Sequence, residues 1–227
     1  QKTGLMKFAP LHLDRFSEVL PEHLPSPGER SRRPRFIPAE GRAKATVGFF
    51  TGCIMDSVFF NINAKTIDLL TKAGANVVLP EAQTCCGALH AHSGRVEFSK
   101  TLAKRNIEAF AAKEVEIIVA NAGGCGARLI EYGELFADKP EWRERARKFV
   151  EKTKDISEVL VDLDGWTLTK PVHETVTYQT SCHLLNVQRV EEAPLQLIQS
   201  IPGIEYREME GADRCCGSGG IYNIVQY

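Results

Sequence analysis

Two kinds of hydrophobic pattern alternate along the middle of the chain. The segment 46–50 (TVGFF) is a short apolar run of β-branched and aromatic residues, which is typical of a buried strand. From 56 to 73 the apolar residues recur at helical spacing, and Gly74 then provides a helix stop. A strand followed by an amphipathic helix indicates a sheet that is covered by helices.

The same alternation continues to about residue 161. Short apolar runs predict strands at 75–80 and 116–120, and helical spacing predicts helices at 95–113, 127–136 and 140–161. Strands that alternate with helices are typical of parallel sheets with crossover connections. The fold class that we expect is therefore α/β.

The first 44 residues do not follow this pattern. They are rich in proline, which interrupts both helices and sheet ladders. We expect a short helix near 13–20 and then an extended linker. The cluster Arg30, Arg32, Arg33 and Arg35 is interpreted as a solvated tether, with a binding patch as the alternative.

The end of the chain repeats the pattern of its middle. The segment 47–53 (VGFFTGC) matches 176–182 (VTYQTSC), and each strand ends at a cysteine that leads into an amphipathic helix. A short strand and a cysteine pair with a glycine follow each helix. We therefore expect two similar βαβ-type halves with parallel sheets. The expected organisation is a proline-rich linker at 1–44, a first cysteine-rich half at 45–170 and a truncated second half at 171–227.

Bulk composition narrows the function classes. With 43% hydrophobic and 25% charged residues, the chain is typical of a soluble globular protein with a real core. The net charge of -1 gives no basic excess that would favour nucleic acid. No apolar run is long enough to cross a membrane, and the first residues lack the apolar stretch of a secretory signal. We expect a cytoplasmic location.

Seven cysteines are the main candidates for chemistry. An odd number argues against a closed set of disulfides, and a chain of this size does not need disulfides to fold. Clustered cysteines in a reducing compartment more often bind metal or carry redox chemistry. The expected ligands of a metal or cluster are Cys53, Cys85, Cys86, Cys125, Cys182, Cys215 and Cys216.

Four of these cysteines are expected to converge. The carboxyl ends of parallel strands share one edge of a sheet, and Cys53, the pair 85–86 and Cys125 each follow a predicted strand. Four thiolates suit an iron–sulfur cluster or a tetrahedral zinc ion. A single zinc ion usually takes CxxC pairs, which the sequence lacks. Directly adjacent cysteines fit better to a larger cluster that is held at two irons.

Glycines and histidines surround the cysteines. The glycines of 123–126, and those after each CC pair, leave backbone amides that can donate to cluster sulfurs and raise the reduction potential. No phosphate-loop motif accompanies these glycines. We interpret His90, His92 and His183 as hydrogen-bond donors near the cluster or as bystanders, rather than as ligands.

The cysteine motifs resemble a known family. The CCG segments, each with an upstream cysteine, are similar to the cysteine-rich CCG domain. This domain occurs in heterodisulfide reductase subunits, anaerobic glycerol-3-phosphate dehydrogenase, lactate-utilisation proteins and glycolate oxidase iron–sulfur subunits. The stretches CCGALHAHSG (85–94), NAGGCGARLIEYGELF (121–136) and CCGSGGIYN (215–223) most resemble the glycolate oxidase iron–sulfur subunits. The resemblance covers about 36–227.

The resemblance implies an electron-transfer subunit with 4Fe–4S clusters. A partner flavoprotein would oxidise a 2-hydroxyacid to the 2-oxoacid, and the clusters would pass the electrons to quinone or another acceptor. The complex would associate with the inner face of the membrane. The sequence has no flavin or nicotinamide motif, so we expect no catalytic residues and no activity of the chain alone.

Two departures from the family pattern affect the expected ligand sets. Family members usually carry an N-terminal ferredoxin-like domain, and heterodisulfide reductase-type sites finish with CxxC, whereas the first half here has only Cys125. The counterpart of Cys125 in the second half would lie beyond Tyr227. We therefore expect a fragment whose second site is incomplete.

Two other function classes remain open at this point. A zinc-bound structural or partner-binding module would use the same thiolates, and metal analysis separates it from an iron–sulfur protein. A thiol–disulfide enzyme would use the adjacent cysteines, but such enzymes usually rely on CxxC and a lowered thiol pKa.

Overall fold

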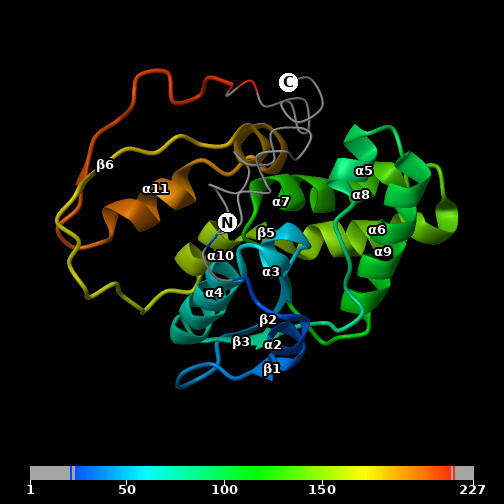
Figure 1. The fold of residues 1–227 in the computed structure, drawn as a ribbon, viewed down its shortest axis with the longest axis horizontal. Helices are drawn as coiled ribbons and strands as arrows, with labels where there is room; N and C mark the ends of the chain where they lie inside the picture. Colours follow the sequence, from blue (N-terminus) through cyan, green and yellow to red (C-terminus); the bar gives the residue numbers. More distant parts are fainter. Residues whose placement is uncertain (1–20, 22–23, 216, 218–227) are drawn as a thin grey trace, which may run out of the picture.

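A five-stranded sheet lies at the centre of the part of the chain that the computed structural model describes, residues 21, 24–215 and 217 (Figure 1). Its strands are β1 (Phe36–Ile37), β2 (Ala45–Phe50), β3 (Ala75–Val78), β4 (Ile117–Ala120) and β5 (Thr153–Asp155). The strand order is β1-β3-β2-β4-β5. The last four strands in chain order are parallel, and β1 joins the edge antiparallel to β3. The predicted α/β class with a mostly parallel sheet is confirmed.

Helices and a second, smaller sheet complete the described elements. The helices are α2 (Pro27–Ser31), α3 (Ile54–Ser57), α4 (Phe60–Lys72), α5 (Ala88–His92), α6 (Val96–Ala111), α7 (Gly123–Ile130), α8 (Tyr132–Leu135), α9 (Pro140–Lys152), α10 (Ile156–Asp162), the π-helix η3 (Leu184–Gln188) and α11 (Glu192–Gln199). The second sheet consists of β6 (Thr175–Val176) and β7 (Glu205–Tyr206).

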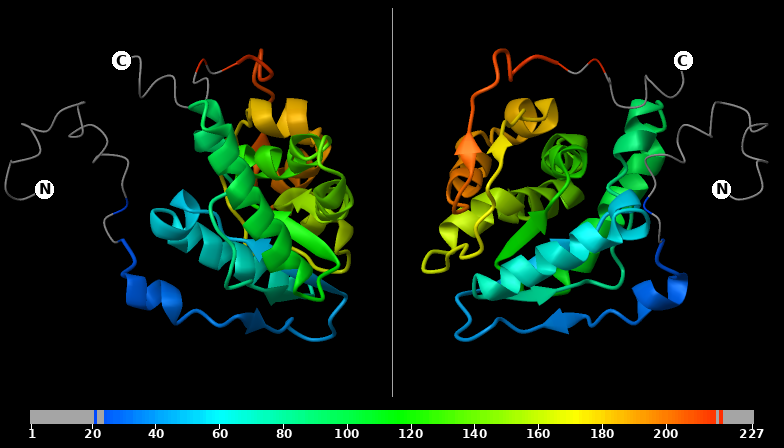
Figure 2. Two further views of the ribbon diagram at one scale, coloured as in Figure 1. Left: turned by 90° about the vertical axis from the view of Figure 1, so that its right-hand side faces the viewer. Right: turned by 60° about the vertical axis from the view of Figure 1, so that its left-hand side comes forward.

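The main sheet is buried between two layers of helices (Figure 2). On one face α6, α8 and α9 pack against Phe50 and β4. On the other face α4 and α10 pack against Val47 and Phe49. Successive residues of a strand point to opposite faces, so β2 contributes to both cores. Gly48 permits the close approach of α6, since a Cβ there would lie 2.9 Å from the ring of Phe110.

Most of the predicted elements are present, but one predicted helix is wrong. In place of one helix over 140–161, the chain forms α9, then β5, then α10. Asp155 starts the last of these with a capping box, because its side chain accepts from the Ser157 amide and Glu158 accepts from the Asp155 amide. The three residues of β5 occupy the free edge of β4, where they add a parallel strand.

From residue 24 onward, the proline-rich segment is more structured than an extended linker. Ser26 and Glu29 form a capping box for α2, and β1 pairs with β3. Arg33 forms an ion pair with Asp56, and its guanidinium lies over the ring of Phe60. This arginine is therefore docked on the first half rather than solvated. The helix expected near 13–20 lies outside the described residues.

The second half forms its own parallel strand–helix–strand unit. β6 pairs in parallel with β7, and α11 lies between them in the chain. The unit rests on the first half, where η3 packs on α7 and α11 packs on α10. Within the described ranges, no helix combines the length and the apolar character that crossing a membrane requires. The boundaries between linker and halves remain predictions.

Candidate metal centre

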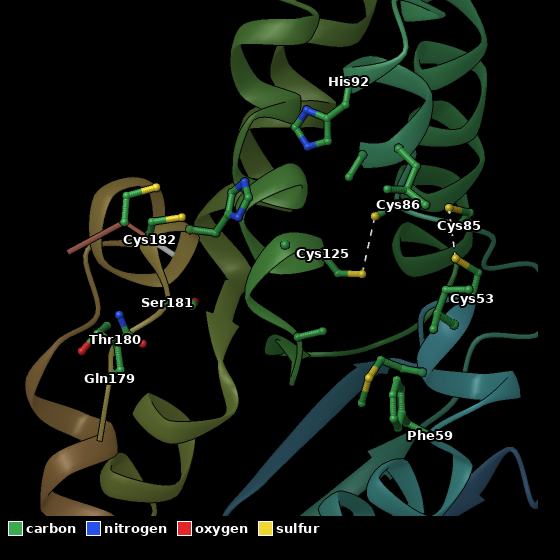
Figure 3. Close-up of a pocket in the computed structure, with 18 of the residues that line it drawn as sticks. Cys53, Phe59, Cys85, Cys86, His92, Cys125, Gln179, Thr180, Ser181 and Cys182 are labelled. Carbon is green, nitrogen blue, oxygen red and sulfur yellow. Dashed lines mark hydrogen bonds between the residues drawn. The ribbon is translucent and has the colours of Figure 1, made fainter. Parts of the chain in front are cut away.

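The six cysteines that the structure describes line one cavity at the carboxyl ends of β2, β3 and β4. The cavity has a volume of about 820 Å³, and both halves contribute to its walls. Figure 3 shows Cys182 on the opposite side of the view from Cys53, with Cys125 between them. The thiol and imidazole groups in its wall belong to Cys53, Cys85, Cys86, Cys125, Cys182, Cys215, His92 and His183.

Each of the four first-half cysteines is delivered by the end of a strand. Cys53 lies just after β2 and precedes α3, and Cys125 lies in the first turn of α7 after β4. Cys85 and Cys86 end the loop that follows β3 and lead into α5. The structure thus brings together the four thiols that the sequence analysis expected to converge.

These thiols form two pairs. The sulfurs of Cys53 and Cys85 are 3.4 Å apart, and those of Cys86 and Cys125 are 3.5 Å apart (Figure 3). Two thiolates on one tetrahedral ion with metal–sulfur bonds of about 2.3 Å lie roughly 3.8 Å apart. Each pair is therefore close to the spacing for one metal ion. The adjacent Cys85 and Cys86 belong to different pairs.

The donor set fits a cluster better than a single ion. Among the described residues, no three His, Cys, Asp or Glu side chains gather closely enough to hold one metal ion. Two pairs of thiols in one cavity instead match a group that contains at least two metal ions. This arrangement agrees with the expectation that adjacent cysteines hold a larger cluster at two irons.

The crowded thiols are poorly acidic without a cation. The hydrogen bond to the Cys125 thiol, together with burial, raises the pKa of Cys86 to about 12. The hydrogen bond to Cys85, with burial, also raises the pKa of Cys53 above its usual range. A bound metal ion reverses this balance, because its positive charge stabilises the thiolates. Deprotonation of these thiols near neutral pH therefore depends on the positive charge of a bound cation.

The two CCG segments share one local geometry. The amide of Gly87 donates to the sulfur of Cys85 at 3.4 Å, and the amide of Gly217 donates to the sulfur of Cys215 at 3.4 Å. Both glycines have positive φ, at 85° and 76°. The repeat seen in the sequence therefore extends to backbone conformation and to the hydrogen bond on the first cysteine of each pair.

The glycines around Cys125 also have a packing role that the sequence analysis did not anticipate. Two of them let η3 and the loop before it approach α7: a Cβ at Gly126 would lie 2.3 Å from Gln188 Oε1, and one at Gly123 would lie 2.7 Å from Ser181 Oγ. The side chain of Gln188 also donates to the carbonyl of Gly123 at 3.1 Å. These glycines serve the packing of the two halves beside the cavity.

The second half adds cysteines to the same cavity rather than to a separate one. Cys182 and Cys215 are exposed cavity-lining residues, and Cys216 lies outside the described residues. The rings of His92 and His183 are 6.1 Å apart across the two halves. His90 packs against Phe98, with ring centroids 4.7 Å apart, and is not part of the cavity wall.

Sequence reasoning missed a group of buried polar residues behind the CCG turn. Ser99, Asn106 and Tyr132 are each 0% exposed and hydrogen-bond to this turn. The available signal was the spacing of two polar residues, seven positions apart, on the otherwise apolar face of α6.

A comparison with protein families supports the internal repeat that the sequence analysis described. The family profile of the cysteine-rich domain, CCG, matches residues 47–130 and again residues 176–227. The two matches correspond to the two segments that the sequence analysis recognised as similar halves.

Individual relatives extend this likeness to nearly the whole chain. A Bacillus subtilis protein named probable glycolate oxidase iron–sulfur subunit is 50% identical over 100% of the chain and 51% of its own length. Lactate utilization protein A is 37% identical in Shouchella clausii and 33% identical in Bacillus subtilis, in both cases over 78% of the chain and 74% of the relative. The chain thus spans about half the length of the first of these relatives.

Proposed function

Because the chain belongs to the CCG family of cysteine-rich domains, we propose that it holds an iron–sulfur cluster and forms the electron-transferring part of an iron–sulfur subunit. The observation that carries this proposal is the arrangement of two thiol pairs in one cavity, with sulfurs 3.4 Å and 3.5 Å apart. Four cysteine thiolates are the usual protein ligands of both 2Fe–2S and 4Fe–4S clusters.

The first-half cysteines are the proposed ligands of one 4Fe–4S cluster: Cys53, Cys85, Cys86 and Cys125. Such a cluster, when bound, supplies one-electron transfer. The chain contributes the thiolates, the amide of Gly87 that donates to Cys85, and the burial of Cys86 from water. These groups control how exposed the cluster is and how much its sulfurs are stabilised by hydrogen bonds.

The second-half cysteines are the proposed ligands of a second cluster: Cys182, Cys215 and Cys216. Support comes from the shared CCG geometry and from the position of Cys182 and Cys215 in the wall of the same cavity. Two clusters in one cavity would lie close enough to exchange electrons directly. His92 and His183, which line the cavity, would donate hydrogen bonds.

The proposed reaction is the oxidation of a 2-hydroxyacid by a flavoprotein partner. The partner removes two electrons from glycolate, or from a similar acid such as lactate, and the clusters of this chain accept them one at a time. The 50% identity to a protein named probable glycolate oxidase iron–sulfur subunit favours glycolate over lactate. The proposed location is the cytoplasm, at the inner face of the membrane through the complex.

Anaerobic purification with iron, sulfide and zinc measured per chain tests the proposal. We expect iron and sulfide in about equal amounts, with broad visible absorption. Cys85→Ser and Cys125→Ser each remove one member of a thiol pair, so most of the iron of the first site should be lost. Met55→Leu is the matched control, because it changes a sulfur-bearing residue of the cavity wall outside both proposed ligand sets and should leave the iron in place.

The same measurement decides against the proposal if its outcome differs. Stoichiometric zinc without sulfide would make the chain a zinc-binding structural module. Undiminished iron in both Cys85→Ser and Cys125→Ser would remove these cysteines from the ligand set.

A further inference from the structure

Three consecutive carbonyls of the CCG turn are held by buried side chains. In the segment 85–87, the first carbonyl accepts from Asn106 Nδ2 at 3.0 Å, the second from the Tyr132 hydroxyl at 2.9 Å, and the third from Ser99 Oγ at 3.0 Å. The three donors come from α6 and α8. The orientations of the three peptide groups after residues 85, 86 and 87 are therefore each fixed by a hydrogen bond from a buried side chain.

The three donors are fully buried, and each has a further hydrogen-bond partner. Asn106 Nδ2 also donates to the Tyr132 hydroxyl at 3.1 Å, and Asn106 Oδ1 accepts from the amide of Thr84 at 2.7 Å. Arg128, one turn after Cys125 in α7, donates to Ser99 Oγ at 2.8 Å. Burying a polar group costs free energy unless it is hydrogen-bonded. These buried bonds therefore favour a single conformation of the 85–87 turn.

Peptide geometry carries the effect of these bonds to the thiols. In a planar trans peptide, the carbonyl of one residue and the amide of the next point in opposite directions. Tyr132 holds the Cys86 carbonyl, so the Gly87 amide faces the other way, and there it donates to the sulfur of Cys85 at 3.4 Å.

The same relation applies one residue later. Ser99 holds the carbonyl of Gly87, so the amide of the next residue, Ala88, points in the opposite direction, and this amide lowers the pKa of the Cys86 thiol. Each buried hydroxyl thus holds a peptide whose amide favours negative charge on a cysteine sulfur.

We infer that Tyr132, which is bonded to Asn106, and Ser99, which is bonded to Arg128, are positioning residues that orient the backbone amides of Gly87 and Ala88 toward the cysteine sulfurs of the turn. This inference rests on the proposed iron–sulfur function. Amides that donate to cluster sulfurs favour the reduced, more negative cluster and raise its reduction potential. Tyr132 and Ser99 would therefore affect the reduction potential and the retention of the cluster, although neither side chain contacts the cluster itself.

Tyr132→Phe tests the first of these links. The variant keeps the ring that packs against Phe149 and loses only the hydroxyl. We expect near-normal iron content, a more negative midpoint potential in an anaerobic redox titration, and loss of iron to a chelator about five- to tenfold faster, as for the loss of one hydrogen bond. Ser99→Ala should act in the same direction through Cys86.

Thr153→Val is the matched control. Thr153 is buried, and its hydroxyl donates to the Phe149 carbonyl at 2.8 Å, away from the CCG turn. It should lower the melting temperature without changing the potential or the rate of iron loss. Should Tyr132→Phe fail to fold, Ser99→Ala decides the question with the same readouts.

The possible failures are distinguishable. A wild-type chain without iron and sulfide overturns the proposed function and this inference together. A wild-type cluster whose potential and chelator sensitivity are unchanged in Tyr132→Phe and Ser99→Ala, or changed equally in Thr153→Val, overturns the inference alone.

Discussion

Two independent structural reasons require glycine at position 87. Gly87 adopts a φ of 85°, which side-chain-bearing residues adopt only with strain, and a Cβ there would lie 2.6 Å from Ser99 Oγ. The third residue of the CCG motif is therefore glycine because of its backbone conformation and because Ser99 occupies the space beside it.

A substitution series at glycines separates these two requirements. Gly87→Ala should lower the free energy of unfolding by about 2 kcal/mol or more, since backbone strain adds to the displaced Ser99 hydrogen bond. Gly94→Ala is the matched control, because Gly94 has a φ of 75° and open space around its Cβ position. It should cost only about 1 kcal/mol. Denaturant unfolding and iron content measure both effects, and equal losses in the two variants would contradict the role of Ser99.

At the residue scale, sequence reasoning found the thiols but not what holds them. Cys53, Cys85, Cys86 and Cys125 could be predicted because cysteine after each strand is a conspicuous pattern. Asn106 could not, because one polar residue within an amphipathic helix resembles many others. Its importance depends on Tyr132 and Thr84, which reach it only in the folded chain.

At the scale of elements, the sequence predicts strands that are continuous apolar runs but does not predict a short polar strand. β2 and β4 are continuous hydrophobic segments buried on both faces, so their sequences predict them directly. β5 has the sequence TKD, which carries no such pattern. It forms a strand because the free edge of β4 offers hydrogen-bonding groups, which is a property of the sheet rather than of the segment.

The start of α10 yields a testable stability difference. Asp155 caps this helix, and burial raises its pKa, so the charged carboxylate is disfavoured in the folded state. Asp155→Ala should lose about 1–2 kcal/mol of unfolding free energy with the cap. Asp155→Asn keeps the acceptor without the charge and should be at least as stable as wild type at pH 7.

The stability difference between wild type and Asp155→Asn should change with pH in a defined direction. A raised folded pKa means that wild-type stability from this group falls as pH rises above the unfolded value of about 3.9. The advantage of Asp155→Asn should therefore grow between about pH 4 and neutral pH. Urea unfolding at several pH values measures it, and an advantage that shrinks with pH would contradict the assignment.

At the scale of the whole molecule, the described residues of the two halves line one cavity instead of two separate cavities. The repeat in the sequence predicted two similar units, but the approach of η3 to α7 depends on Gly126 and Gln188, which no periodicity connects. The resemblance of the halves was readable from the motifs, whereas their docking is a property of complementary surfaces.

The proposed division of labour predicts how activity depends on a partner. The isolated chain, reconstituted with iron and sulfide, should not oxidise glycolate or lactate with an artificial dye as acceptor. Adding a flavoprotein subunit should produce dye reduction, and Cys125→Ser should abolish electron transfer while leaving the flavoprotein's own reduction by substrate unchanged. Stopped-flow absorbance separates the two steps. Robust turnover by the chain alone would contradict the subunit role.

The pairing of the thiols also orders events during synthesis. Within each pair the partners are far apart in the chain, by 32 positions for Cys53 and Cys85 and by 39 for Cys86 and Cys125. The ribosome makes Cys53, Cys85 and Cys86 well before Cys125, and the second pair is complete only after β4 has been added to the sheet. A nascent chain that stops before β4 therefore exposes one complete thiol pair and one unpaired thiol. If the proposed cluster binds here, the emergence of Cys125 after β4 is the earliest point in synthesis at which both thiol pairs can receive metal.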